Sequence, residues 1–300
     1  MAISAPARFA RVMIVGASGQ LGTDLLEVFS DRRPVGLTHA EIFIENPESV
    51  AGALELHRPE LVLNTAAFHN VQVCEREPRR ALQVNAAGVG GFARACAQRG
   101  CAFGTFSTDY VFDGQKGAPY VEEDEPRPIN AYGLSKLAGE LLVQAETPRH
   151  FIFRTSGLFG RVGSKSKGYT FIDRILQGAA AGEPLSVVSD MIFSPSYTRD
   201  VASAVRDIVD RGEFGIYHVV NAGWCTWYEF ALEALAQAGL QAEVAAISTA
   251  QWGAQVRRPP NSSLRNCRME RAGLAELPDW RSAVNRYVAE RASGVSATRP

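Results

Sequence analysis

The sequence predicts a doubly wound α/β fold, in which helices cover both faces of a parallel sheet, with a smaller interleaved C-terminal lobe. Two observations support this prediction. Short runs of β-branched and aromatic residues alternate with amphipathic stretches of helical length through the first half of the chain. The first of these runs ends in a glycine-rich turn that leads directly into a helical stretch. Such alternation favours parallel strands joined by crossover helices.

The elements of the first half can be assigned in order. Residues 11–15 (RVMIV) form the first strand, and residues 20–29 form a helix whose leucines make one apolar face. The later strands are expected at 34–37, 61–64, 103–107 and 151–155, and the helices between them at 47–56, 78–98 and 129–145.

The second half is less regular. We expect helices at 171–180, 198–209 and 227–238, strands at 185–188 and 215–220, and a Gly/Ser/Lys-rich loop at 161–168. The predicted division is a sheet domain of residues 9–157 plus about 188–222, a lobe of about 158–187 plus 223–290, and frayed ends at 1–8 and 291–300. The lobe should lie over the carboxyl ends of the strands, where ligands bind in such folds.

Composition narrows the function classes. The 300 residues include 31 Lys+Arg against 32 Asp+Glu, a net charge of −1, which predicts no nucleic-acid or membrane-surface partner. No apolar run is long enough for a membrane span or a signal peptide, and the five cysteines form no CxxC pair, so we expect a cytoplasmic protein with reduced, packed cysteines. The five histidines show no metal-ligand spacing, and no metal site is predicted. A small molecule is the expected partner.

The glycine-rich turn is the first functional signal. Gly16, Gly19 and Gly22 follow the first strand and open the first helix. Glycines let the backbone turn sharply and approach a pyrophosphate closely, and the helix N-terminus offers free N–H groups to it. Because of this placement, the sequence predicts a dinucleotide-binding Rossmann domain, although a purely structural turn would have the same glycines.

The end of the second predicted strand bears on which dinucleotide binds. An NAD site usually has an acidic residue there for the ribose 2′-hydroxyl. Residues 36–40 read GLTHA and contain no carboxylate, whereas the side chains of Thr38 and His39 could tolerate a 2′-phosphate. We therefore favour NADPH and keep NADH as the alternative.

Tyr132 and Lys136 form the second functional signal. Their i, i+4 spacing on a predicted helix puts both on one face, and Ser107-Thr108 end a strand 24 residues before Tyr132. We expect the ammonium to lower the phenol pKa toward neutrality, and the hydroxyl of Thr108 or Ser107 to hydrogen-bond the substrate oxygen. This set predicts hydride transfer with tyrosine as the proton donor.

Longer motifs resemble those of a known family. In chain order they are GASGQLG, LVLNTAAF, VNAAG, FSTDYVFDG, PYVEEDEPRPINAYGLSKLAGE, FRTSGLFG, SPSYTRDVA, GIYHVV, WYEF and RPPNSSL, over roughly residues 11–285. The chain resembles the extended short-chain dehydrogenases/reductases and, within them, the dTDP-4-dehydrorhamnose reductases, for which STDYVFDG followed by YGxSKLAGE is specific. The resemblance implies a reductase of a 4-keto-6-deoxy sugar carried on a nucleoside diphosphate, with a homodimer as one possible assembly.

The site residues follow from these signals and from the resemblance. Thr108, Tyr132 and Lys136 are the expected catalytic residues. The expected cofactor-binding residues are Gly16, Ser18, Gly19, Gln20, Leu21, Gly22, Thr38, His39, Ala66, Ala67, Asn85, Ser107, Tyr132 and Lys136. The expected substrate-binding residues are Phe68, Asp109, Tyr110, Gly157, Phe193, Arg258, Asn261 and Ser262. Arg258 belongs to a basic pair that suits a diphosphate, although solvent-exposed pairs also look like this.

The chain also departs from the family pattern. Gly157 stands where a tryptophan is usual, Met191-Ile192-Phe193 stand where Asp-Gln-x-Gly is usual, and Gln72 stands where Asp is usual. We expect the missing tryptophan to leave a gap beside the sugar, which Phe193 could refill, and so a pocket that accepts more than one sugar.

Two other functions remain open. A non-catalytic dinucleotide-binding subunit, like the regulatory β-subunit of methionine adenosyltransferase, shares this sequence branch, but the complete Thr108, Tyr132 and Lys136 set favours an enzyme. A nucleotide-sugar epimerase or dehydratase shares the Tyr-Lys pair. A dehydratase needs an acid pair after the strand-end threonine, and the sequence there is Asp109-Tyr110.

Overall fold

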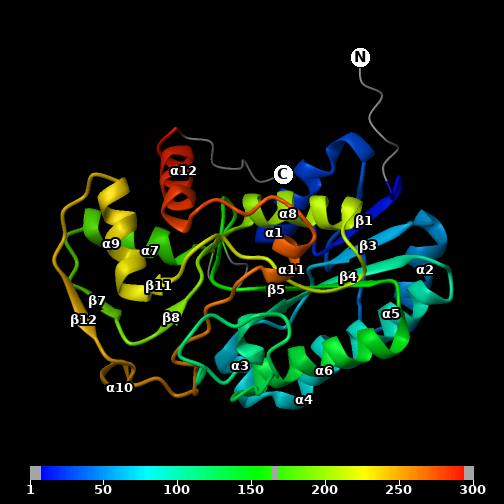
Figure 1. The fold of residues 1–300 in the computed structure, drawn as a ribbon, viewed down its shortest axis with the longest axis horizontal. Helices are drawn as coiled ribbons and strands as arrows, with labels where there is room; N and C mark the ends of the chain where they lie inside the picture. Colours follow the sequence, from blue (N-terminus) through cyan, green and yellow to red (C-terminus); the bar gives the residue numbers. More distant parts are fainter. Residues whose placement is uncertain (1–7, 164–167, 294–300) are drawn as a thin grey trace.

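A six-stranded parallel sheet forms the centre of the larger part of the molecule (Figure 1). The computed structural model describes residues 8–163 and 168–293. The strands lie in the order β10-β5-β4-β3-β1-β2, and each pair is parallel. Their bounds are β1 Val12–Val15, β2 Val35–Leu37, β3 Leu61–Asn64, β4 Ala102–Thr108, β5 His150–Thr155 and β10 Gly215–His218. The predicted doubly wound α/β class is confirmed.

Helices cover both faces of this sheet (Figure 1). The helices α1 (Gln20–Val28) and α8 (Thr198–Arg211) pack on one face, and α2 (Pro47–His57), α5 (Val89–Ala97) and α6 (Ala131–Glu146) on the other. Each face encloses its own hydrophobic core because successive strand residues point to opposite sides. The carboxyl ends of the strands therefore stay open to a ligand.

The predicted helix at 78–98 contains an irregular turn. It consists of α4 (Pro78–Leu82), a π-helical segment (Gln83–Gly88) and α5, and a short helix α3 (Val71–Arg76) that the sequence analysis missed precedes it. A π-helical turn adds a residue and re-aims side chains, and such turns are frequent at functional sites. Here the turn holds Asn85 toward the loop after β3.

The smaller lobe is built from helices around an aromatic core. Its helices are α7 (Phe171–Ala180), α9 (Trp227–Gln237), α10 (Thr249–Trp252) and α12 (Trp280–Ala292). The short helix α11 (Cys267–Arg271) instead packs against β10, and its Met269 lies in the core of the sheet domain. Short strand pairs complete it: β7 (Leu185–Val188) with β12 (Val244–Ile247), β8 (Ile192–Phe193) with β11 (Cys225–Thr226), and β6 (Leu158–Phe159) with β9 (Ser196–Tyr197). The sequence did not predict α10, α11, α12, β12 or any of the four two-residue strands. The predicted domain boundaries stay a prediction.

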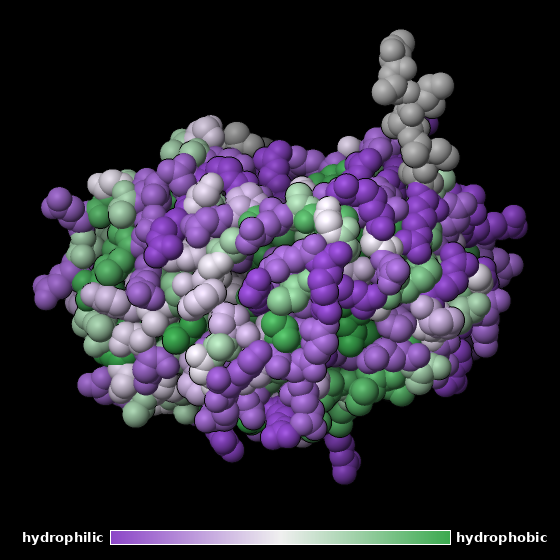
Figure 2. Space-filling model, in the orientation of Figure 1, coloured by the Kyte–Doolittle hydropathy of each residue, from purple (hydrophilic) through white to green (hydrophobic). Residues whose placement is uncertain are grey.

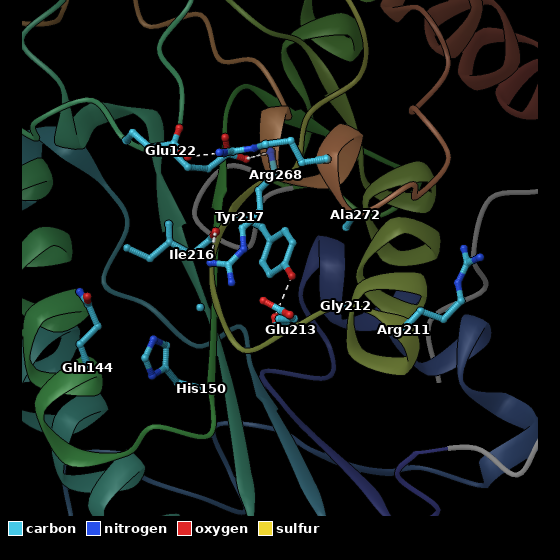
Figure 3. A pocket seen from close by; sticks show the side chains of 13 residues that line it. Glu122, Gln144, His150, Arg211, Gly212, Glu213, Ile216, Tyr217, Arg268 and Ala272 are labelled. Carbon is cyan, nitrogen blue, oxygen red and sulfur yellow. Dashed lines mark hydrogen bonds and ion pairs between the residues drawn. The ribbon is translucent and has the colours of Figure 1, made fainter.

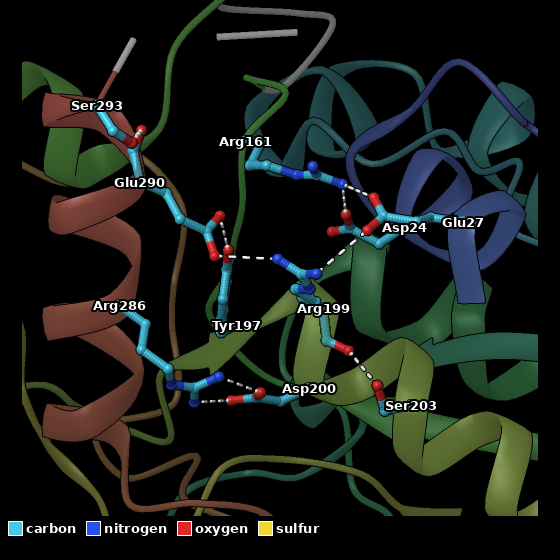
Figure 4. Close-up of polar contacts among 10 residues, drawn as sticks. All are labelled: Asp24, Glu27, Arg161, Tyr197, Arg199, Asp200, Ser203, Arg286, Glu290 and Ser293. Atoms are coloured by element: carbon cyan, nitrogen blue, oxygen red, sulfur yellow. Dashed lines mark hydrogen bonds and ion pairs between the residues drawn. The ribbon is translucent and has the colours of Figure 1, made fainter. Parts of the chain in front are cut away.

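Ion pairs join the smaller lobe to the sheet domain (Figure 4). Arg161 pairs with the buried Asp24 of α1 at 2.9 Å and also with Glu27. Arg199 of α8 bridges Glu27 (3.2 Å) and Glu290 of α12 (3.1 Å). The network therefore ties α12 to α1, the helix that follows the glycine turn.

The predicted frayed ends and the 161–168 loop lie partly outside the described residues. Residues 1–7, 164–167 and 294–300 are not described. Two described residues that were expected in the frayed ends are ordered. Arg8 donates a hydrogen bond to the Gly212 carbonyl at 2.6 Å, and α12 continues through Ala292. Within residues 8–163 and 168–293, no helix combines the length and apolar character that a membrane crossing requires, and no three metal-ligating side chains form a group that could hold an ion.

Candidate active site

A cavity of about 770 Å³ opens at the carboxyl ends of the central strands. Most of the predicted site residues line it, and they come from different segments of the chain. These residues are Gly16, Gly19, Gln20, Leu21, Thr38, His39, Ala66, Ala67, Phe68, Ser107, Thr108, Asp109, Tyr132, Lys136 and Gly157. The fold thus brings the glycine turn and the Tyr-Lys pair to one cavity.

The glycine turn has the geometry of an anion site. Gly16 has φ +79°, and a Cβ there would lie 2.4 Å from the Thr65 hydroxyl oxygen. Gly22 packs against the turn so closely that a Cβ would lie 2.3 Å from the Gly16 carbonyl oxygen. The N-cap of α1 is Gly19, which has no side chain to satisfy the first N–H groups. These groups and the helix dipole therefore remain available to a phosphate.

Close backbone contacts place α6 in the site. The side chain of its N-cap, Asn130, accepts a hydrogen bond from Gly133 N at 2.8 Å. A Cβ at Gly133 would lie 2.1 Å from the Tyr110 carbonyl oxygen, so only glycine lets the helix approach the segment after β4. This approach puts Tyr132 within hydrogen-bonding contact of Thr108.

Thr108 is held by its neighbours. Its hydroxyl donates to Asp109 Oδ1 at 2.9 Å and accepts from Tyr110 N at 3.2 Å. Asp109 is buried, its other oxygen accepts from Ser156 at 2.8 Å, and it is also hydrogen-bonded to Ser262. Burial raises the pKa of this carboxyl although the hydrogen bonds oppose the shift. Because Ser156 and Ser262 hold the Asp109 carboxylate in place, its hydrogen bond with the Thr108 hydroxyl orients Thr108.

The predicted tuning of Tyr132 by Lys136 is wrong for this structure. Burial raises the pKa of Tyr132 well above its ordinary value, and the hydrogen bond with Thr108 offsets this only in part. Burial also lowers the pKa of Lys136 to about 8, against the attraction of Glu140. Desolvation disfavours the charged form of each group and is the main cause of both shifts. The phenol consequently keeps its proton at neutral pH, as a proton donor must.

Asn85 does not line the cavity. It is 1% exposed, and its amide bonds the N–H and carbonyl of Phe68 (both 2.8 Å) and the Ser135 hydroxyl (2.9 Å). With these three bonds its amide is engaged, so it fixes the Phe68 loop and does not reach a cofactor. Ser107, in contrast, has a buried hydroxyl with no protein partner at the cavity wall.

The expected gap at Gly157 is absent, because Phe193 refills it, and the range of sugars that the pocket accepts stays a prediction. A Cβ on Gly157, whose φ is +48°, would lie 2.3 Å from Phe193 Cε2. Phe193 is only 2% exposed and stacks on Trp227 with ring centroids 3.9 Å apart. It belongs to the core of the smaller lobe and supports the cavity wall from behind, so it is not a substrate contact as predicted.

The RPPNSSL segment packs against the STDYVFDG segment. Arg258 hydrogen-bonds Tyr110 and lies over the Trp252 ring at 4.9 Å. Ser262 contacts Asp109, and Asn261 accepts from the Ser263 hydroxyl at 2.7 Å. These residues adjoin the catalytic group but do not line the cavity.

Of the turn residues, Ser18 is exposed and Gly22 is buried, and neither lines the cavity.

The structure also shows lining residues that the sequence analysis missed. Thr65 fixes the turn by donating to the Val15 carbonyl at 2.8 Å. Arg80 of α4 pairs with Glu45 at 2.5 Å, and both line the cavity. The position of Thr65 directly after a predicted strand could have marked it as a site residue. The Arg80–Glu45 pair joins residues 35 positions apart, so no local sequence pattern could have predicted it.

A second cavity of about 730 Å³ lies along the outer edge of β10 (Figure 3). Arg268 donates to the carbonyls of Phe214 (2.7 Å) and Ile216 (3.2 Å), and Glu122 accepts from His218 N at 3.0 Å. Side chains thus satisfy the unpaired groups of this edge strand. This cavity is part of the edge cover and contains none of the predicted catalytic residues.

A Rossmann sheet with an N-terminal glycine turn, and a Tyr-Lys pair beside a strand-end threonine, defines the class of extended short-chain dehydrogenases/reductases. Within this class, the chain belongs to the family of dTDP-4-dehydrorhamnose reductases. The family model described as the RmlD substrate binding domain matches residues 10–293.

Curated relatives are similar over nearly their whole length. A spore coat polysaccharide biosynthesis protein, SpsK, of Bacillus subtilis is 36% identical over 285 residues, covering 94% of this chain and 98% of the relative. A dTDP-4-dehydrorhamnose reductase of Aggregatibacter actinomycetemcomitans is 35% identical over 290 residues, with 92% and 97% covered.

Solved structures are also similar to this chain. The dTDP-4-dehydrorhamnose reductase of Bacillus anthracis, in complex with NADP, aligns with TM-score 0.89 and 33% identity over 93% of this chain and 99% of that one. A UDP-glucose 4-epimerase of Thermotoga maritima aligns with TM-score 0.83 over 95% and 99%, but at 17% identity it shows the shared fold alone.

Proposed function

We propose that this protein reduces the 4-keto group of a nucleoside-diphosphate 4-keto-6-deoxy sugar, as a dTDP-4-dehydrorhamnose reductase does, with NADPH or NADH. One observation carries the proposal: Thr108, Tyr132 and Lys136 line the same cavity as the glycine turn. Family membership over the whole chain supports the substrate class.

The residues present fit a dinucleotide. Gly16 leaves no room for a side chain, the first turn of α1 is uncapped, and the buried Ser107 hydroxyl has no protein partner. We propose that the turn residues Gly16, Ser18, Gly19, Gln20, Leu21 and Gly22 hold the pyrophosphate, while Thr38 and His39 contact the adenosine ribose. Ala66, Ala67, Ser107 and Lys136 would line the rest of the cofactor site, and Asn85 would act only through the Phe68 loop. A bound reduced nicotinamide supplies the hydride.

The protein's own residues manage the proton. When hydride reaches C4, the ketone oxygen becomes an alkoxide, which is a stronger base than a phenolate. Tyr132 donates its proton to that oxygen, so the carbonyl becomes a hydroxyl and a phenolate remains until solvent restores the proton. Thr108 orients the phenol. Lys136, largely protonated below pH 8, supplies positive charge in the cavity that stabilises the phenolate.

We further propose that the nucleotide-sugar lies between the Phe68 loop and the Tyr110–Arg258 contact. Arg258 carries a charge that suits the diphosphate, and Asp109, Asn261 and Ser262 keep this wall in place. Gly157 lets the chain pass close to Phe193 behind the sugar.

A homodimer and a cytoplasmic location are also proposals. The exposed face of α6 carries Leu134 (52% exposed), Leu141 (59%) and Leu142 (38%). The two charged residues in the middle of this helix, Lys136 and Glu140, are buried and so do not add charge to that face. Figure 2 shows hydrophobic surface over this part of the molecule. Such a face suits contact with a second copy. Light scattering on wild type and Leu141→Glu tests it: loss of a dimer in the variant supports this face, and a wild-type monomer contradicts it.

The deciding experiment is cofactor oxidation against a panel of 4-keto-6-deoxy nucleotide-sugars. We expect turnover with at least the dTDP sugar and loss of turnover in Tyr132→Phe. Binding of cofactor without turnover on any sugar would favour the non-catalytic alternative. Conversion without net cofactor oxidation would favour an epimerase.

A further inference from the structure

A carboxylate of the chain itself occupies the hydrogen-bond donors at the end of β2. Thr38 lines the cavity, and both its N–H (2.8 Å) and its hydroxyl (2.9 Å) donate to the same oxygen, Oε2 of Glu41. The Thr38 carbonyl in turn accepts from Glu41 N (3.0 Å) and Ile42 N (3.1 Å). The chain therefore makes one helical turn after β2, and this turn brings the Glu41 side chain back to Thr38. The expectation of no carboxylate at this strand end rested on residues 36–40, and Glu41 is the next residue along the chain.

The position of this contact relates it to cofactor choice. In doubly wound folds, the adenosine ribose lies at the carboxyl end of the second strand. Two donors that converge on one point form a receptor for an anionic oxygen. The Glu41 carboxylate is exposed next to the lining residues Thr38 and Ile42, and it occupies donors that an oxygen of the 2′-phosphate, which distinguishes NADPH from NADH, would otherwise use. The Thr38 hydrogen bonds lower the pKa of Glu41, so it is charged at neutral pH.

The two cofactors meet this carboxylate differently. A ribose 2′-hydroxyl can donate to Glu41 and leave its bonds to Thr38 intact. A 2′-phosphate, in contrast, meets a like charge and finds the Thr38 donors already taken. The arginine among the lining residues, Arg80, is paired with Glu45 at 2.5 Å, so part of its charge is already compensated. His39, the other basic side chain at this strand end, is exposed and packs its ring against Phe43.

We propose that Glu41 is a specificity-determining residue that weakens NADPH relative to NADH. The inference rests on the proposed function, because it assigns a role to Glu41 only if this cavity holds a nicotinamide dinucleotide.

A purely structural role for Glu41 makes a different prediction. A Thr-x-x-Glu pair can simply cap a turn, and glutamine caps as glutamate does. Glu41→Gln therefore keeps an acceptor for the Thr38 donors and removes only the charge. If the pair matters only for the turn, this variant will bind both cofactors as wild type does.

The test is fluorescence titration of the full chain with NADPH and with NADH, which needs no sugar. We expect Glu41→Gln to raise the ratio of NADPH to NADH affinity by about tenfold, as for like charges a few ångströms apart in water. The same ratio should rise with salt in wild type, because ions screen the repulsion, and rise less in the variant. Glu48→Gln removes an exposed carboxylate from the first turn of α2 and is the matched control.

The outcomes separate the two proposals. A shifted ratio in Glu41→Gln alone supports the inference. An unchanged ratio, parallel loss of both cofactors, or an equal shift in Glu48→Gln overturns it while leaving the proposed function in place. Failure of wild type to bind either cofactor overturns both.

Discussion

Gly157 offers a direct test of how the two lobes fit together. We predict that Gly157→Ala destabilises the protein because the new Cβ meets the edge of the Phe193 ring at 2.3 Å, and Phe193 is fixed against Trp227. Neither ring can move without opening the core of the smaller lobe. The backbone at this position, with φ +48°, also resists any residue with a Cβ.

The expected size follows from three contributions. The left-handed backbone costs roughly 1–2 kcal/mol, and overpacking in a well-packed core costs typically 1–3 kcal/mol. Reduced flexibility of the unfolded chain returns about 0.4–1 kcal/mol. The free energy of unfolding should therefore fall by about 1–4.5 kcal/mol.

Urea denaturation of both proteins measures this difference. Gly52→Ala is the matched control, since its Cβ meets nothing within 4 Å on the exposed side of α2, and it should stabilise by up to about 1 kcal/mol. In Gly157→Ala/Phe193→Leu, the smaller side chain should relieve the overpacking, so the double variant should lose less stability than the two single losses predict. A loss below about 0.5 kcal/mol in Gly157→Ala would refute the reasoning, because surface substitutions reach that size.

Three further predictions concern the catalytic helix. Tyr132→Phe should abolish reduction while leaving cofactor affinity within about twofold, because it removes one hydroxyl and keeps the ring; steady-state assays that show retained turnover would exclude the proton-donor role. Lys136 has its pKa lowered to about 8 in the folded protein. Between that pH and its ordinary value the unfolded chain holds more protons, so stability should rise with pH in this window. Denaturation at both ends of the window should show a smaller rise in Lys136→Met, and an equal rise would contradict the assignment. Glu140→Gln should cost about 3–5 kcal/mol of stability, because it leaves the buried Arg154, now 2.7 Å from a carboxylate oxygen, without a counter-charge; a midpoint equal to wild type in the same urea experiment would refute this.

Local sequence determined the sheet, the crossover helices and the catalytic set. Most strands and helices of the first half follow from hydrophobic period, since apolar faces repeat within each element, whereas α3 and the π-helical turn at 83–88 did not. The glycine turn spans only seven residues, from the end of β1 into the start of α1, and the Tyr132–Lys136 pair lies on one helix, so position in the chain fixes the geometry within each of them. Most of the predicted cofactor residues accordingly line the cavity.

Only the tertiary structure decided the features that depend on distant partners. The ring of Phe193, which is 36 positions further along the chain, fills the space beside Gly157. The side-chain amide of Asn85 hydrogen-bonds the backbone of Phe68. The pKa of Tyr132 is raised, opposite to the predicted direction, mainly because its side chain is buried, and burial is not encoded by any local motif. Glu41 reached Thr38 because the chain turns after β2. Contacts and desolvation are properties of the packed molecule, so they became visible only when the elements were assembled.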